Sequence, residues 1–150
     1  MCEGLVLEAA KDLIPFDRPL SSTDLNYLSK KILKIPNYRG AFSKDKLPKK
    51  IWEQGESGII NLEDYDAGGG SHWCAYATRP NEHRPCYFDS FGDLAPPNSL
   101  KDYLGPGIMY NVKRVQNFDQ VTCGHLCLYF LHRLGETGNY ARTLDEFISY

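Results

Sequence analysis

The stretch from Val115 to Cys127 contains the residues of this chain that are best suited to covalent chemistry. Gln116 lies seven positions before Cys123, and an apolar pattern typical of a helix begins at that cysteine. The amides at the start of a helix favour a thiolate, which is the nucleophilic form of cysteine. The side chain of Gln116 and the backbone N–H of Cys123 could bind a reaction oxyanion, and the whole arrangement is what a cysteine protease needs.

Less reactive interpretations of these residues remain open. A lone cysteine is usually a buried packing residue, and a glutamine usually lies at the surface. Gly124 favours the reactive interpretation, because a residue without a side chain would leave the thiol open to a substrate backbone. Gln120 competes with Gln116 as the donor, although its position three residues before Cys123 suits a helix cap better.

The general base has four candidates, and His72 is the favoured one. It begins a strand pattern directly after Gly68-Gly69-Gly70, so a rigid element would hold the ring beside an unobstructed approach. His83 lies in a polar loop. His125 lies on a different side of the helix from Cys123, and His132 lies in the last turn of that helix. A core or surface position is the ordinary alternative for each of them.

Asp89 is the candidate acid that would orient this base. It ends the strand pattern 86–90 among aromatic residues, where an unpaired carboxylate would be costly to bury. If this strand pairs with strand 72–78, Asp89 can accept a hydrogen bond from Nδ1–H of His72. That bond would fix the tautomer and stabilise the imidazolium. A carboxylate bonded to loop amides at a strand end is the alternative.

Helical patterns occupy both ends of the chain and strand patterns occupy the middle, which predicts an α+β domain over residues 1–150. Helices are expected over 3–14, from a cap among Ser21-Ser22-Thr23 to Pro36, from the N-cap Thr122 to Gly135, and from a Thr143–Glu146 capping box to Tyr150. The third of these should bury Leu126, Cys127, Phe130, Leu131 and Leu134. Strands are expected over 58–62, 72–78, 86–90 and 108–115, and an irregular connection over 36–57.

The composition excludes several other classes of protein. With 150 residues, 42% hydrophobic and 24% charged, the chain is ordinary for a soluble domain, and neither a membrane span nor a signal peptide is expected. The net charge of −2 gives no support for nucleic acid as a partner. A small basic cluster is expected to be a solvated loop, with binding of an acidic partner as the alternative (Lys44, Lys46, Lys49 and Lys50). Five irregularly spaced cysteines favour a reducing, intracellular compartment.

No metal or cofactor is expected. His72-Trp73-Cys74 and Cys123–Cys127 offer soft ligands, but their spacing does not fit the usual zinc patterns. Glycines 68–70 lack the following helix and lysine of a phosphate loop. A zinc-dependent structural domain is the alternative, and metal analysis of the purified protein would identify it.

Four stretches together resemble the adenain family of adenovirus maturation proteases: Gly69–Trp73, Tyr87–Gly92, Val115-Gln116 and Cys123-Gly124. The match is closer to the adenain-like proteases of Maverick/Polinton elements and related double-stranded DNA viruses, through Ile35–Gly40 and Gly124–Leu131. The resemblance covers roughly residues 20–135.

The resemblance implies a permuted papain-like fold, in which the helix that carries the nucleophile packs against a mixed central sheet. It implies Cys123 as nucleophile, His72 as base, Asp89 as the orienting acid and Gln116 with the Cys123 amide as the oxyanion hole. Adenain has Glu where this chain has Asp89, and other members of the clan use Asp. The residues expected to contact substrate are Gly70, Trp73 and Gly124.

The implied function is a cysteine endopeptidase that cleaves after Gly in Gly-Gly-like sites, usually in virion precursor proteins. Its partner would be a protein or peptide substrate, in the host cytoplasm or nucleus or packaged in the virion. The chain has no cysteine in residues 87–122, where the family anchors an activating peptide, so any such peptide is expected to bind non-covalently. The alternatives are a deconjugase of ubiquitin-like modifiers and an inactive peptide-binding module of the same fold.

Overall fold

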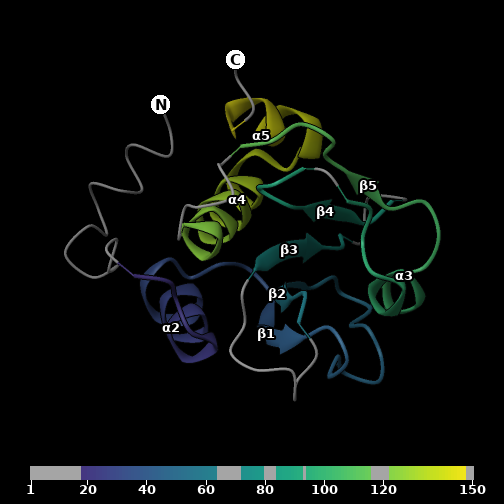
Figure 1. The fold of residues 1–150 in the computed structure, drawn as a ribbon, viewed down its shortest axis with the longest axis horizontal. Helices are drawn as coiled ribbons and strands as arrows, with labels where there is room; N and C mark the ends of the chain where they lie inside the picture. The colour runs from purple at the N-terminus through teal and green to yellow at the C-terminus, as the bar shows by residue number, and fades with distance from the viewer. Residues whose placement is uncertain (1–17, 64–71, 80–83, 93, 116–121, 148–150) are drawn as a thin grey trace.

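The computed structural model describes residues 18–63, 72–79, 84–92, 94–115 and 122–147. Its strands form one mixed sheet in the order β1-β2-β3-β4-β5 (Figure 1). The pairs β1–β2 and β4–β5 are parallel, and β3 is antiparallel to both of its neighbours. The strands are β1 (Tyr38–Ser43), β2 (Ser57–Asn61), β3 (Trp73–Ala77), β4 (Cys86–Phe88) and β5 (Met109–Tyr110).

Helices cover both faces of this sheet, and two hydrophobic clusters fill the space beneath them. The helices are α2 (Ser22–Tyr27), the π-helix η1 (Leu28–Ile32), α3 (Asn98–Leu104), α4 (Cys123–Thr137) and α5 (Tyr140–Phe147). Because side chains alternate along a strand, Ala75 of β3 packs beneath α2, α4 and α5, whereas Tyr76 packs on the opposite face beneath α3 (Figure 1). No helix within the described residues is long and apolar enough to cross a membrane.

The helix α4 begins as expected and ends later than expected. Thr122 occupies the N-cap position and Cys123 is the first helical residue. Four of the five residues expected in the core are buried, and Leu126 is half-buried. Gly135 does not end the helix; it lies against Pro36, where an added Cβ would come within 3.1 Å of the proline ring. The helix ends at Gly138 instead, whose φ of 68° suits a glycine.

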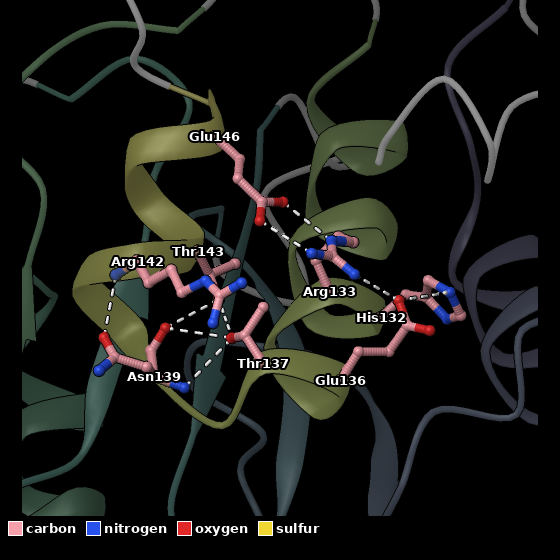
Figure 2. A network of polar contacts seen from close by, with 8 residues as sticks. All are labelled: His132, Arg133, Glu136, Thr137, Asn139, Arg142, Thr143 and Glu146. Carbon is pink, nitrogen blue, oxygen red and sulfur yellow. Dashed lines mark hydrogen bonds and ion pairs between the residues drawn. The ribbon is translucent and has the colours of Figure 1, made fainter. Parts of the chain in front are cut away.

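The predicted capping box of the last helix is wrong. Helix α5 begins at Tyr140, because the Asn139 side chain accepts the backbone N–H of Arg142 at 2.9 Å. Thr143 therefore lies inside the helix and is fully buried. Glu146 pairs with Arg133 of α4 at 2.8 Å, and Figure 2 shows this pair joining the two helices. The pair holds α5 against the helix that carries Cys123.

The remaining expectations have mixed outcomes. Ser21 caps α2 in a capping box with Asp24, and the strands expected near 58–62, 72–78 and 86–90 are present. The irregular connection 36–57 is wrong in part, because β1 lies within it as an edge strand. Helix α3 was not expected, and β5 is shorter than the predicted strand 108–115. The predicted helix 3–14 lies outside the described residues.

Candidate active site

The first turn of α4 is fixed to the start of β3 by two cysteines. The backbone N–H of Trp73 donates to Sγ of Cys123 at 3.5 Å. One turn later, the thiol of Cys127 donates to the carbonyl of the same tryptophan at 3.4 Å. Burial holds the pKa of Cys127 well above its ordinary value, so this thiol keeps its proton. Cys123 thus accepts a hydrogen bond at a helix N-terminus, whereas Cys127 is a packing residue, as expected from the sequence.

His72 and Asp89 form a short hydrogen bond next to this contact. His72 directly precedes Trp73, and its carbonyl accepts the N–H of Leu62 at 3.1 Å, which extends the β2–β3 pairing. The β3–β4 hairpin, as predicted, is antiparallel with Ala75 opposite Phe88. Nε2 of His72 lies 2.6 Å from Oδ1 of Asp89, and both residues are buried.

The expectation that Nδ1 makes this bond is wrong. Neighbouring strands lie about 4.8 Å apart, and Nε2 is the ring nitrogen that reaches furthest from the backbone. It therefore bonds across the hairpin to Asp89. Nδ1 of His72, which stays near its own backbone and thus near Trp73, is buried without a hydrogen bond among the described residues. One nitrogen of the ring remains available for proton transfer with Cys123.

The surroundings of His72 favour its protonated form. Burial by itself lowers the pKa of the ring, but the hydrogen bond that the ring donates to Asp89 and the neighbouring thiol of Cys123 raise it, and the result is a pKa of about 12. The ring of Phe91 stacks on the imidazole with a centroid separation of 3.9 Å and an interplanar angle of 5°. The raised pKa favours the imidazolium form of His72.

Sequence reasoning missed two residues of this site. Phe91 stacks on His72, and its backbone N–H donates to Oδ1 of Asp89 at 2.9 Å. The side chain of Asn111 bonds both the N–H and the C=O of Asp89, at 2.9 and 2.6 Å. A signal for the second was present, because Asn is depleted in strands and yet interrupts the pattern expected from 108 to 115.

Two expected substrate contacts lie in the core instead. Gly124 is buried, and an added Cβ would lie 3.4–3.5 Å from Leu20, Leu25 and Trp73, so this glycine does not leave a path to the thiol. The indole of Trp73 is buried and donates to the carbonyl of Leu20 at 2.9 Å. Both residues position α4 and the segment before α2 rather than face open space.

Gly70 and the oxyanion candidate Gln116 lie outside the described residues. The chain just before Gln116 is described, and it is anchored beside the acid. Val115 donates its backbone N–H to the carbonyl of Ser90, the residue after Asp89, at 2.7 Å. Residues 111–115 and 89–90 are therefore joined side by side.

One group of potential metal ligands lies at this site. Ligand atoms of His72, Cys74 and Asp89 lie within 4.8 Å of one another. However, His72 and Asp89 are only 2.6 Å apart, whereas two such atoms on one tetrahedral zinc are separated by about 3.4 Å. Burial also raises the pKa of Cys74 to about 11, which favours the thiol over the metal-binding thiolate. The present geometry is that of a hydrogen-bonded acid–base pair.

The fold is shared with a protease of known structure. A selenomethionine crystal structure of the ASFV pS273R protease gives a TM-score of 0.57 at 14% sequence identity, over 85% of this chain and 62% of that chain. A second crystal structure of that protease gives a TM-score of 0.49 at 14% identity, over 97% of this chain and 76% of that chain. No protein-family profile and no curated protein sequence matches this chain.

This likeness concerns the fold. The expected papain-like α+β fold, with a mixed central sheet and the helix of Cys123 packed against it, is confirmed. The chain spans less than two thirds of the length of the first of these structures, namely 62%.

Proposed function

We propose that this protein is a cysteine endopeptidase with Cys123 as nucleophile, His72 as the proton carrier and Asp89 as the orienting acid. The observation that carries the proposal is the 2.6 Å bond between Nε2 of His72 and Asp89, which leaves Nδ1 unbonded among the described residues next to the start of α4. The residue after His72, Trp73, donates its backbone N–H to Sγ of Cys123, so the imidazole is attached beside the thiol. The shared fold with a viral protease supports the same reading.

The reaction follows from this arrangement. The Cys123 thiolate attacks the carbonyl carbon of the scissile peptide bond, while its proton resides on His72. The backbone N–H of Cys123 and the side chain of Gln116 bind the resulting oxyanion, and each such donor stabilises the transition state by about 3–4 kcal/mol. His72 gives its proton to the leaving amine, and a thioester remains on Cys123. Water, deprotonated by His72, then hydrolyses the thioester and restores the thiol.

The substrate we propose is a polypeptide with a Gly-Gly-like site, cleaved after the glycine. The likeness of the chain to adenain-like proteases supports this choice, and precursor proteins of a virus or transposon particle are the substrates that it suggests. The enzyme would act inside the host cell or the particle. An activating peptide, if the enzyme uses one, would bind non-covalently.

The test is hydrolysis of a fluorogenic peptide that ends in Gly-Gly before the reporter. Cys123→Ala is expected to abolish turnover while the circular dichroism spectrum is unchanged. Cys86→Ala, which makes the same change at another buried cysteine, is the matched control and retains activity. Turnover by Cys123→Ala at the wild-type rate would end the proposal. Comparing the peptide with a folded ubiquitin-like modifier fused through Gly-Gly separates an endopeptidase from a deconjugase.

A further inference from the structure

Asn111 joins two backbone segments at the active site through its side chain alone. Its Oδ1 accepts the N–H of Asp89 at 2.9 Å, and its Nδ2 donates to the C=O of Asp89 at 2.6 Å. The same Nδ2 donates to the C=O of Lys113 at 3.1 Å. The residue is 3% exposed, so water does not replace these bonds. Asp89 is therefore held at both of its backbone polar groups by a single amide.

These bonds continue the sheet beyond the point where its strands stop pairing. The last backbone pair of β4 and β5 is Tyr87 with Tyr110, two residues before the acid. A paired strand would bond Asp89 through one N–H and one C=O, and the amide of Asn111 supplies the same two groups. Nearby, Gly92 has a φ of 67°, and an added Cβ would come within 2.2 Å of the Lys113 carbonyl. The two segments thus approach in backbone contact.

We propose that Asn111 is a positioning residue of the peptidase, which sets the direction from which the Asp89 carboxylate holds His72. The inference rests on the proposed function. With the backbone of Asp89 fixed by Asn111 and its Oδ1 fixed by the N–H of Phe91, the carboxylate has one orientation, and in that orientation it bonds Nε2 of His72. Without the amide, Asp89 loses both bonds to its backbone from Asn111 and the carboxylate loses its alignment, although the bond from Val115 to Ser90 still joins the two segments.

The variant Asn111→Ala is expected to lower kcat/KM by roughly 10- to 100-fold, because a misplacement of about 1 Å at a reacting group costs about that much. The loss is expected to fall on kcat with KM little changed, since Asn111 is buried and bonds backbone groups of Asp89 and Lys113. The acidic and basic limbs of the pH–rate profile also shift, because His72 no longer has a fixed partner. In NMR titrations, the imidazole of His72 titrates at lower pH in the variant than in the wild type.

Asn26 offers a matched control elsewhere in the fold. Its Oδ1 accepts the backbone N–H of Ala41 at 2.9 Å and the hydroxyl of Tyr38 at 3.0 Å, so it joins α2 to β1 in a similar way. Asn26→Ala is expected to lower the thermal unfolding temperature without changing the His72 titration or the pH–rate profile. Asn111→Ser, which keeps a hydroxyl able to bond Asp89, replaces Asn111→Ala if the latter does not fold.

A double-mutant cycle with Asp89→Asn decides how Asn111 acts. If Asn111 acts through Asp89, adding Asn111→Ala to Asp89→Asn changes kcat by less than twofold and leaves the titration midpoint of His72 unchanged. Losses that multiply independently, or an Asn111→Ala enzyme with the wild-type pH profile, overturn the inference. If the wild-type protein shows no Cys123-dependent cleavage, the peptidase proposal is overturned. If Asn111→Ala still shifts the His72 titration in that case, the positioning of His72 by Asn111 stands.

Discussion

Two buried carboxylates flank the ends of β3: Glu56 lies beside Thr78, after the strand, and Asp89 bonds His72, before it. Asp89 and Glu56 are each 1% exposed. The oxygens of Glu56 accept four bonds of 2.6–2.9 Å, from Arg39, the backbone of Trp52, Tyr76 and Tyr103. Oδ1 of Asp89 accepts from Phe91 and from His72, and His72 retains a ring nitrogen without a hydrogen bond among the described residues.

The protonation states of the partners sharpen this difference. Burial and the Glu56 carboxylate raise the pKa of Tyr76, and they raise that of Tyr103 to about 12, so both phenols stay protonated as donors. The Glu56 cluster therefore has no proton to exchange near neutral pH and ties α3 to the strands. The partner of Asp89 is an imidazole, which can release a proton and is placed beside a thiol. A buried acid with hydrogen-bonded partners stabilises the fold at Glu56, and we propose that at Asp89 it also serves catalysis.

The largest expected effect comes from Asp89→Asn. The amide cannot stabilise the imidazolium of His72, so kcat/KM should fall on the order of 10³- to 10⁴-fold. The measurement is peptide hydrolysis normalised to the folded fraction from urea unfolding. If Asp89→Asn hydrolyses the peptide with a kcat/KM within tenfold of wild type, Asp89 has a structural role like that of Glu56.

Glu56→Gln should show the opposite balance. The neutral side chain leaves Arg39 without its counter-charge and cannot accept all four donors, so the free energy of unfolding should drop by about 3 kcal/mol. Hydrolysis by the protein that remains folded should stay within threefold of wild type. Urea titration followed by tryptophan fluorescence gives the first quantity, and loss of activity without loss of stability would contradict the assignment.

The pH dependence of stability should differ between wild type and Asp89→Asn. Because the pKa of His72 is raised from 6.5 to about 12 on folding, its contribution is complete below pH 6.5 and is lost as the pH rises towards 12. Wild type should therefore lose stability between pH 6.5 and 9 more steeply than Asp89→Asn. Urea midpoints across this range give the two slopes, and equal slopes would show that Asp89 does not hold a protonated His72.

The smallest effect is expected at Glu146, a more exposed acid. The hydrogen bond from Arg133 lowers the pKa of Glu146, so its contribution is present above pH 4.5 and disappears as the pH falls through the lowered value. Glu146→Gln should reduce the free energy of unfolding at pH 7 by about 0.5–1 kcal/mol, as is usual for a solvent-accessible ion pair. The difference should vanish in acid, and one that persists there would assign it to packing.

The elements that carry the site could be predicted because their signals are local. A polar N-cap candidate before an apolar helical pattern locates the start of α4 at Cys123, and a Pro-bounded loop between two strand patterns predicts the hairpin. The hairpin in turn brings His72 to Asp89. Each of these inferences uses neighbouring residues or one short connection.

The rest depends on contacts between distant segments, which local patterns do not encode. Arg39 of β1 bonds Glu56, the residue just before β2, and this partner is 17 residues away in the sequence. Gly124 was expected to face a substrate, but α4 packs so closely on Trp73 that the glycine lies in the core. The use of Nε2 rather than Nδ1 by His72 and the bonds of Asn111 likewise follow from strand register. Both residues bond Asp89, which is 17 residues from His72 and 22 residues from Asn111 in the sequence.

The central claim is that His72, held by Asp89, activates Cys123. It is tested most directly by the rate of iodoacetamide labelling at Cys123 as a function of pH, read by mass spectrometry in a Cys2→Ser background. Cys123 is 6% exposed, the most of the cysteines in the described part of the chain. We expect rapid labelling at pH 6.5 that slows on the order of 100-fold in His72→Ala and in Asp89→Asn. Equal rates in wild type and His72→Ala would contradict the account.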